Sequence, residues 1–323
     1  MDFLILVLIV ALGSFGLIML IMPKFIALLK SHDLFQEVSE YAIEEYKHKD
    51  KTPAMGGILF VVIPTLLIFI AYPTIYRDEK FLMVSVSYLL FAIIGFLDDL
   101  LIILFKNNNG LHPKLKLFLQ LLFALIIYFL FPNVIDNAIT IPYLNIEISL
   151  GLLYLPFMIL LYAAEANAVN FTDGMDGLCA GVSFIALIPF LIFSFLENEL
   201  DLSLLIIGIL ASLLAYLHFN RAPAKIYMGD SGSLALGALF TSLAIVLDQE
   251  IALFFVGGVF VIEMLCVCIQ LTSVKLFHRR VFLYTPIHYA FRLKGVEDKN
   301  IINGFYIAAL LFSIVGLLIG VGI

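Results

Sequence analysis

The sequence predicts an all-α integral membrane protein, and three observations support this class. Of the 323 residues, 63% are hydrophobic and only 13% are charged. The mean hydropathy is +1.10, whereas a soluble domain is about half apolar and about a quarter charged. The apolar residues also gather in runs of about 20, the length that an α-helix needs to cross a bilayer. No internal repeat or low-complexity linker divides the chain, so we expect one multi-pass domain over residues 1–323.

Ten apolar runs are long enough to be transmembrane helices, for which the range is about 17–25 residues. They cover residues 3–23, 54–72, 82–104, 115–131, 149–166, 178–195, 203–218, 232–247, 251–276 and 301–322. The first run has no basic n-region and is longer than the apolar core of a signal peptide. We therefore expect it to remain in the protein as a spanning helix.

Two connecting segments have a pattern of their own. Residues 132–148 alternate weakly around Pro142 and Asn145, which is consistent with a small β-hairpin. Residues 33–51 carry apolar side chains near helical spacing, which is typical of a helix lying in the membrane interface.

The basic residues decide the orientation. Ten spans place the connections 24–53, 105–114, 167–177, 219–231 and 277–300 on one side. With the flanking Lys116 and Lys275, that side holds 16 of the 18 Lys and Arg residues. An excess of Lys and Arg marks the cytoplasmic side. Both termini are therefore expected on the extracytoplasmic side.

Five aspartates lie on the expected cytoplasmic side, at or just inside helix ends: Asp98, Asp99, Asp173, Asp176 and Asp230. Neighbouring carboxylates in a low-dielectric setting raise one another's pKa or bind a cation. Ionisable residues in spanning segments mark functional sites by default. Any one of them could simply cap a helix or reach water, but five on one side indicate a functional site.

The segment "NAVNFTDGMDG" (167–177) combines amides, carboxylates and glycines. Asn170, Asp173 and Gly177 are expected to share one helical face because steps of three and four residues align, with Asp176 beside them. Amides and carboxylates supply the donors and acceptors that bind a nucleobase and ribose hydroxyls. Gly174 and Gly177 permit close approach or unusual backbone angles.

The segment "GDSGSLALG" (229–237) suggests a phosphate and metal site. Asp230 or Ser231 is expected to cap the eighth helix, and a helix N-terminus favours phosphate. Asp230 would repel a phosphate there unless a divalent cation bridged the two. Oxygen ligands beside a phosphate favour Mg²⁺, which takes one or two carboxylates and keeps several waters.

Two glutamates lie in the apolar runs. Glu263 is near the middle of its run, where a charge is costly, so we expect it to bind buried backbone or a neighbouring polar group. Glu165 ends its run and is expected to reach water.

Seven segments together resemble the polyprenyl-phosphate N-acetylhexosamine-1-phosphate transferase superfamily, and within it the phospho-N-acetylmuramoyl-pentapeptide transferase family. They are "KTPAMGG" (51–57), "GFLDDL" (95–100), "KLKLFLQ" (114–120), "NAVNFTDGMDGL" (167–178), "FNRAPAKIYMGDSGSLALG" (219–237), "VFVIEMLCVCIQ" (259–270) and "VFLYTPIHYAFRLKG" (281–295). They occur in the family's order and run nearly the length of the chain.

The resemblance implies a fold and a reaction. The fold has ten transmembrane helices, both termini outside and the active site on the cytoplasmic side, usually as a homodimer. The reaction moves phospho-MurNAc-pentapeptide from UDP-MurNAc-pentapeptide to undecaprenyl phosphate in the bilayer. It gives lipid I and UMP, requires Mg²⁺ and involves no nucleic acid.

The resemblance also implies roles for matching residues. Asp98, Asp99 and Asp230 match catalytic positions, with Asp98 the base or, on a rival scheme, the nucleophile, and Asp230 the Mg²⁺ ligand. The matching substrate-binding positions are Lys51, Lys106, Lys116, Asn170, Asp173, Asp176, Gly177, Asn220, Tyr227, Gln270 and His288. The lysines lie near the phosphates, and Tyr227 stands where an aromatic ring stacks on uracil.

The chain departs from the family at one place. The family carries three consecutive histidines in the last cytoplasmic loop, but here the run is His288, Tyr289 and Ala290. Tyr289 still offers a hydroxyl, whereas Ala290 offers no polar group. The surrounding sequence favours the muramoyl branch over the sister branch that uses UDP-GlcNAc.

Two further function classes compete with an enzyme. A secondary transporter places its carboxylates near the midplane, often with repeat symmetry, whereas these aspartates lie at helix ends. A structural membrane protein needs no clustered Asn, Asp and Gly on one side.

Overall fold

The computed structural model describes residues 2–32, 34–35, 52–105, 110–144 and 146–323, and the expected interfacial helix at 33–51 falls mostly outside this part. The helices in it are α1 Phe3–Ser31, α2 Gly57–Ala71, α3 Glu79–Phe105, α4 Pro113–Leu130, α5 Tyr154–Thr172, α6 Leu178–Leu196, α7 Leu200–Asn220, α8 Asp230–Val246, α9 Glu250–Val256, α10 Gly258–Phe277, α11 Ile287–Leu293 and α12 Asp298–Val321. Short 3₁₀ turns occupy Pro73–Arg77, Pro142–Leu144 and Gly151–Leu153.

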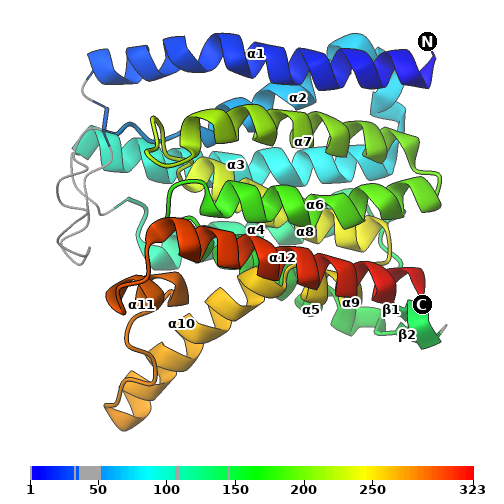
Figure 1. Cartoon of the computed structure of the whole chain (residues 1–323). Coiled ribbons are helices and arrows are strands. Elements are labelled where there is room, and N and C mark those ends of the chain that lie inside the picture. Colours follow the sequence, from blue (N-terminus) through cyan, green and yellow to red (C-terminus); the bar gives the residue numbers. More distant parts are fainter. Residues whose placement is uncertain (1, 33, 36–51, 106–109, 145) are drawn as a thin grey trace.

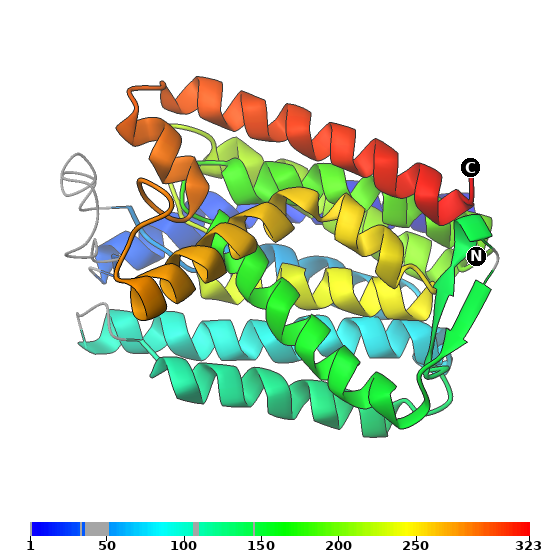
Figure 2. The same cartoon turned by 90° about the horizontal axis from the view of Figure 1, so that it is seen from below.

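The long helices form a bundle that runs between two ends (Figure 1). Both termini lie at one end, together with the two strands, and α11 lies at the other end (Figures 1 and 2). α10 diverges from the bundle, so that its C-terminal half stands away from the other helices (Figure 1). That half exposes a row of apolar side chains, among them Leu271, Leu276 and Phe277, as expected of a surface in contact with lipid.

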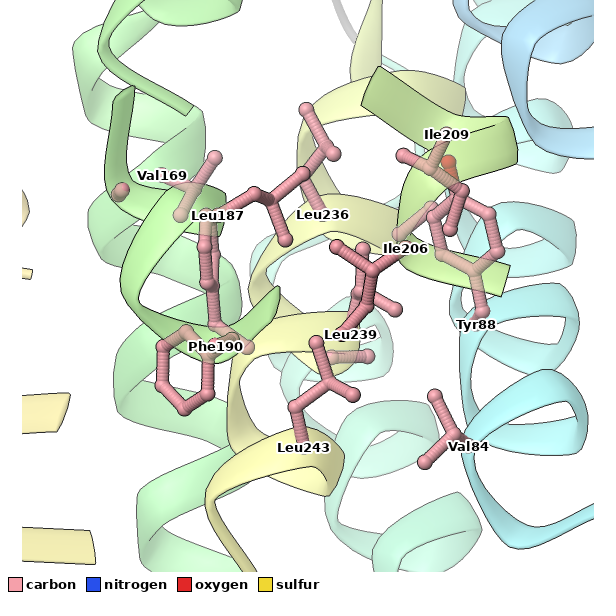
Figure 3. Close-up of a cluster of buried hydrophobic side chains, with 14 of the residues drawn as sticks. Val84, Tyr88, Val169, Leu187, Phe190, Ile206, Ile209, Leu236, Leu239 and Leu243 are labelled. Atoms are coloured by element: carbon pink, nitrogen blue, oxygen red, sulfur yellow. The ribbon is translucent and has the colours of Figure 1, made fainter. Parts of the chain in front are cut away.

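Helix α8 is the centre of the bundle. Every residue from Ser231 to Val246 is buried, and α8 packs against α2, α3 and α5. Its leucines interdigitate with Val84 and Tyr88 of α3 and with side chains of α6 and α7 (Figure 3). A helix that is apolar on all sides suits this fully enclosed position.

Small residues let the backbones around α8 approach closely. A Cβ atom on Gly95 of α3 would collide with the backbone of Asp230 and Ser231. One on Gly237 would collide with the backbone of Ala166 in α5. Small residues at helix contacts are typical of membrane bundles, where helices associate by close packing. Gly95 thus sets the position of the start of α8 against α3.

The predicted membrane class is confirmed at the level of helix length and composition. In the part of the chain that the structure describes, eight helices are long and apolar enough to cross a membrane. They match eight of the ten expected spans. The other two spans correspond to the shorter apolar helices α2 and α8, so the count of ten remains a prediction.

The ninth expected span, 251–276, is wrong as one helix. The structure divides it at Gly257 into α9 and α10. A Cβ on Gly258 would collide with the ring of Phe312 in α12, so the two glycines let the chain pass close to α12 while it changes direction. Hydropathy could not reveal the break because both sides of it are apolar.

The expected hairpin is confirmed. Strands β1 Ala138–Ile141 and β2 Ile146–Ser149 pair antiparallel, with Ala138 opposite Ser149 and Ile141 opposite Ile146. Two strands alone are only marginally stable, and β1 is held against α9.

Glu250, at the start of α9, predicts a pH-dependent stability. Its side chain is buried and accepts a hydrogen bond from the Tyr154 hydroxyl at 2.6 Å. Burial, helped by the charges of Asp248 and Asp136, raises the pKa of the Glu250 carboxyl to about 7. The folded state then holds a proton that the unfolded state has lost between about pH 4.5 and pH 7, so stability falls as pH rises through that window. Thermal unfolding of the wild type should therefore show a melting temperature that falls between pH 5 and pH 7. The fall should be clearly smaller in Glu250→Gln, and an equal fall in both proteins would contradict the assignment.

Candidate active site

Among the described residues, an acidic cluster and the ammonium group of Lys116 lie at the end of the bundle opposite the termini. Asp98 comes from the C-terminal part of α3, Lys116 from the first turn of α4 and Asp230 from the first position of α8. The Lys116 ammonium forms ion pairs with both carboxylates, at 3.4 Å from Asp98 Oδ1 and in direct contact with Asp230 Oδ2. The fold thus joins three residues that are up to 132 positions apart in sequence, as their placement at matching helix ends predicted.

Asp99 has a different task from Asp98. Its two oxygens accept hydrogen bonds from the backbone N–H groups of Asp230 at 2.9 Å and Ser231 at 3.0 Å. The expectation that Asp230 or Ser231 caps α8 is therefore wrong, because the cap is supplied by α3 and the residue before the helix is Gly229. Gly229 has φ +76°, a conformation that glycine adopts without strain.

The start of α8 has no N–H group left for a phosphate. The Gly229 N–H donates to Asp173, Asp99 accepts the N–H groups of Asp230 and Ser231, and the Gly232 N–H donates to the Gly229 carbonyl at 3.2 Å. All four N–H groups that a helix start leaves unpaired are thus satisfied within the protein. The expectation that these N–H groups bind a phosphate is therefore wrong. Positive charge for a phosphate must come from side chains or a metal.

The donor set fits a divalent cation. Asp98, Asp99 and Asp230 each offer an oxygen, and these atoms lie within 4.8 Å of one another. Because Asp99 already accepts two N–H groups, Asp98 and Asp230 are the oxygens best able to hold a metal. One or two carboxylates with remaining waters is the set that Mg²⁺ prefers. The Lys116 ammonium already pairs with the same two carboxylates, so the position between Asp98 and Asp230 stabilises a positive charge.

The loop before α4 closes over Asp98. The N–H of Leu111 donates to Asp98 Oδ1 at 2.9 Å, and a Cβ on Gly110 would lie 2.7 Å from Asp98 Oδ2. Lys106 and Lys51 lie outside the described residues.

The segment 167–177 is not helical throughout. α5 ends at Thr172, and the N–H of Asp173 bonds to the carbonyl of Asn170 at 3.1 Å. The expected shared helical face of Asn170, Asp173 and Gly177 is therefore wrong, because the chain turns at Gly174 and reaches φ +81° at Gly177. Asn170 remains half-buried in the last turn of α5.

Asp173 connects this turn to the acidic cluster. It accepts the backbone N–H of Gly229, and the charge of Asp230 acts on it. Burial first, and then the carboxylates of Asp230 and Asp176, raise the pKa of the Asp173 carboxyl to about 7. Perturbed carboxyls that gather in one place are typical of functional sites.

Two of the predicted binding residues hold loops together. Asn220 accepts the Gly177 N–H at 3.0 Å and donates to the Ile226 carbonyl at 2.9 Å. Asp176 accepts the Ala224 N–H at 2.9 Å. The turn after α5 and the loop before α8 are thus fastened to each other.

Tyr227 holds the segment before α2. Its N–H donates to the Pro53 carbonyl at 2.8 Å, and its carbonyl accepts the Gly56 N–H at 2.9 Å. The Gly57 N–H donates to the Met228 carbonyl at 2.9 Å. The half-buried Tyr227 ring packs against Ala54 and Met55, so residues 53–57 lie against the loop that leads to Asp230.

Gln270 and His288 belong to the last part of the chain. The side-chain amide of Gln270 in α10 forms three hydrogen bonds to the backbone. Its oxygen accepts the N–H groups of Val281 at 2.9 Å and Phe282 at 3.0 Å, and its NH₂ group donates to the Phe282 carbonyl at 3.1 Å. Glu263, as expected, binds buried backbone and a polar group: it accepts the N–H of Ile287 at 2.7 Å and the ring N–H at His288 Nδ1, 3.0 Å away. Among the described residues no partner reaches His288 Nε2, which is fully buried.

Comparison with known proteins agrees with this arrangement. Residues 81–248, which include the whole acidic cluster, match glycosyl transferase family 4. The phospho-N-acetylmuramoyl-pentapeptide-transferase of Staphylococcus saprophyticus is 36% identical over 306 residues, covering 94% of this chain and 95% of that protein. The protein of the same name from Staphylococcus aureus strain MSSA476 is 38% identical over 309 residues, covering 93% and 95%. The chain belongs to the phospho-N-acetylmuramoyl-pentapeptide-transferase family.

Within this transferase family fold, sequence reasoning missed some residues that shape the site. The Tyr306 hydroxyl of α12 donates to the Gly177 carbonyl at 2.7 Å, and the Asn167 amide donates to Gln120 Oε1 at 2.7 Å. A single tyrosine in an apolar span was the only available signal for Tyr306. Glu165, expected to reach water, is buried instead, because α5 continues two turns beyond it.

Proposed function

We propose that this protein transfers phospho-MurNAc-pentapeptide from UDP-MurNAc-pentapeptide to undecaprenyl phosphate, releasing UMP and forming lipid I for peptidoglycan synthesis. The observation that carries the proposal is the pairing of Lys116 with Asp98 and Asp230, in a chain 36–38% identical to transferases of that name. Such a centre suits phosphoryl transfer, which depends on positioning and on charge stabilisation more than on covalent chemistry.

The side chains of the cluster divide the work. Asp98 orients the lipid phosphate or takes its last proton. Lys116, held between two carboxylates, neutralises charge on the diphosphate. Asp99 fixes the start of α8 and thereby the place of Asp230. Mg²⁺ held by Asp230, with Asp98 beside it, would supply further charge neutralisation to the diphosphate and the leaving UMP.

We propose that the transfer is direct. An oxygen of the lipid phosphate forms a bond to the phosphorus that carries the sugar, and the bond from that phosphorus to the UMP oxygen breaks. The lipid phosphate is largely ionised near pH 7, so a base has little to supply. Trapping phospho-MurNAc-pentapeptide bound covalently to Asp98, with UMP released, in enzyme incubated with donor and Mg²⁺ but without lipid would favour the covalent route instead.

The nucleotide belongs beside the turn at Gly174. Asn170, Asp173 and Asp176 offer amide and carboxyl groups there, and the segment 167–177 itself contains no Lys or Arg, a composition that suits hydroxyls and base edges better than phosphate. Tyr227, on the loop fastened to this turn, offers an aromatic face to the uracil.

The protein is proposed to lie in the bacterial cytoplasmic membrane as a homodimer. Ten spans would place both termini outside and the acidic cluster on the cytoplasmic side. The positions of the termini at one end of the bundle and of α11 at the other support this arrangement (Figure 1), as does the basic bias of the loops next to α11.

Asp173 predicts a pH dependence of nucleoside binding. With a pKa of about 7, the carboxyl is mostly protonated at pH 6 and mostly ionised at pH 8. The ionised form is the better acceptor for ribose hydroxyls. Uridine, which carries no phosphate, should therefore bind the metal-free protein several-fold more tightly at pH 8 than at pH 6, measured by calorimetry. Asp173→Asn should remove the dependence, and an unchanged slope in that variant would exclude Asp173 as its source.

Donor choice tests the proposed activity. Purified protein, undecaprenyl phosphate and Mg²⁺ are incubated with either UDP-MurNAc-pentapeptide or UDP-GlcNAc, and the lipid product is identified by mass spectrometry. We expect lipid I from the first donor and no product from the second. Product from UDP-GlcNAc alone would place the chain in the sister branch, and no product from either would reject the proposal.

A further inference from the structure

Tyr289 connects helix α11, in which it lies, to the turn after α5. Its hydroxyl donates to the Gly174 carbonyl at 2.8 Å, although the two residues are 115 positions apart. Gly174 directly follows Asp173 and lies two residues before Asp176. The hydrogen bond is therefore made to a residue that lies between Asp173 and Asp176, whose carboxyl groups are proposed to bind the nucleotide.

Packing reinforces the hydrogen bond. A Cβ atom on Gly174 would collide with His288 Nε2 and would lie only 2.8 Å from the Tyr289 hydroxyl oxygen. The rings of His288 and Tyr289 lie 4.2 Å apart, and Tyr284 packs edge-on against Tyr289 at 5.7 Å. Only a glycine allows the turn to lie directly against this pair of rings.

Helix α11, which carries Tyr289, is in turn held by Glu263 of α10. The Glu263 carboxylate accepts the N–H groups of Ile287 and His288 at 2.7 and 3.3 Å, and the ring N–H at His288 Nδ1. Both Glu263 and His288 are fully buried. These hydrogen bonds fix the start of α11. The Tyr289 side chain, which α11 carries, is therefore itself held in position against Gly174.

We propose that Tyr289 is a positioning residue: by holding the Gly174 carbonyl it sets the place of Asp173 and Asp176 and so the affinity for the nucleotide-sugar donor. The kinetic part of this inference rests on the proposed function. The chain has a tyrosine where the family it resembles carries a second histidine, and a tyrosine places its polar atom farther from the backbone than an imidazole does. The hydrogen bond to the Gly174 carbonyl thus depends on the length of the tyrosine side chain at position 289.

The kinetic test is Tyr289→Phe, which keeps the ring and removes the hydroxyl. One hydrogen bond contributes about 0.5–1.5 kcal/mol net, so the KM for UDP-MurNAc-pentapeptide should rise roughly 2- to 12-fold. The kcat and the KM for undecaprenyl phosphate should change by less than about 2-fold, because Asp98, Lys116 and Asp230 are untouched. Tyr76→Phe, which removes the hydroxyl of an exposed tyrosine at the opposite end of the bundle, is the matched control and should leave all three constants unchanged. A donor KM that is the same in Tyr289→Phe and wild type would overturn the role in binding.

Amide hydrogen exchange tests the positioning without any turnover. Exchange in residues 173–178 should be several-fold faster in Tyr289→Phe than in the wild type and in Tyr76→Phe, while α12 stays unchanged. Unaltered exchange in this segment would overturn the proposal whatever the kinetics. If the wild type failed to release UMP, the proposed function would fail, and the exchange result would still decide whether Tyr289 holds the turn.

Discussion

Asp230→Ala will abolish transfer while leaving the bundle folded. Asp230 is the first residue of α8 and pairs with Lys116 in the acidic cluster. Its removal takes away the proposed Mg²⁺ ligand and leaves the charge of Lys116 balanced by Asp98 alone. Loss of several kcal/mol of charge stabilisation corresponds to a fall of about 10³-fold or more in kcat. The measurement is the rate of UMP release at saturating substrates and Mg²⁺.

Folding is not at risk in this variant, which makes the result interpretable. The backbone N–H of residue 230 donates to Asp99 whatever its side chain, so the cap of α8 survives. Glu79→Ala is the matched control, since Glu79 is also an acidic residue that opens a helix but lies at the other end of α3. Full turnover by Asp230→Ala, with a melting temperature equal to that of the control, would remove Asp230 from the metal role.

Asp98→Asn will lower kcat with little effect on donor binding. The amide is isosteric and can still receive the Leu111 N–H, but it can neither take a proton nor balance Lys116. A reacting group displaced by about 1 Å can lose about 10²-fold in rate, so we expect kcat to fall by about 10²-fold when the carboxylate that orients the lipid phosphate becomes an amide. Steady-state kinetics will separate the two constants, with the KM for UDP-MurNAc-pentapeptide unchanged within about 2-fold.

The comparison variant for Asp98 is Glu147→Gln, an exposed acid in β2 at the far end of the bundle. It should behave as wild type. A kcat of Asp98→Asn equal to that of Glu147→Gln would show that the Asp98 carboxylate takes no part in the chemical step, and a rise confined to KM would assign it to binding.

The approximate positions of the helices, and the end of the bundle at which each one begins, were predictable from the sequence because they follow from the order of the apolar runs. The runs of apolar residues and the excess of Lys and Arg on one side placed Asp98 and Asp230 at the same ends of neighbouring helices. Lys116, at the start of the fourth run, had to lie at that end too. What brought these three into contact is the close approach at Gly95, which no pattern of hydropathy encodes.

The direction of side chains was not predictable in the same way. Asn220 and Gln270 have the residue types of a binding site, yet their amides hold loops of the protein. Asp99 stands next to Asp98, but successive residues of a helix point about 100° apart, so one faces Lys116 and the other faces α8. The break at Gly257 was hidden because a glycine inside an apolar run leaves hydropathy high, and the tie from Tyr289 to Gly174 joins segments whose contact depends on the whole fold.

A single-turnover measurement of UMP tests the central claim that this cluster carries out direct, metal-dependent transfer between two phosphates. Excess purified protein is mixed with UDP-MurNAc-pentapeptide in three ways: with undecaprenyl phosphate and Mg²⁺, without the lipid, and with the lipid but with Mg²⁺ removed by chelation. The proposed reaction predicts one UMP per donor in the complete mixture and none in the other two. Stoichiometric UMP without the lipid, equal UMP without Mg²⁺, or no UMP from the complete mixture would contradict it.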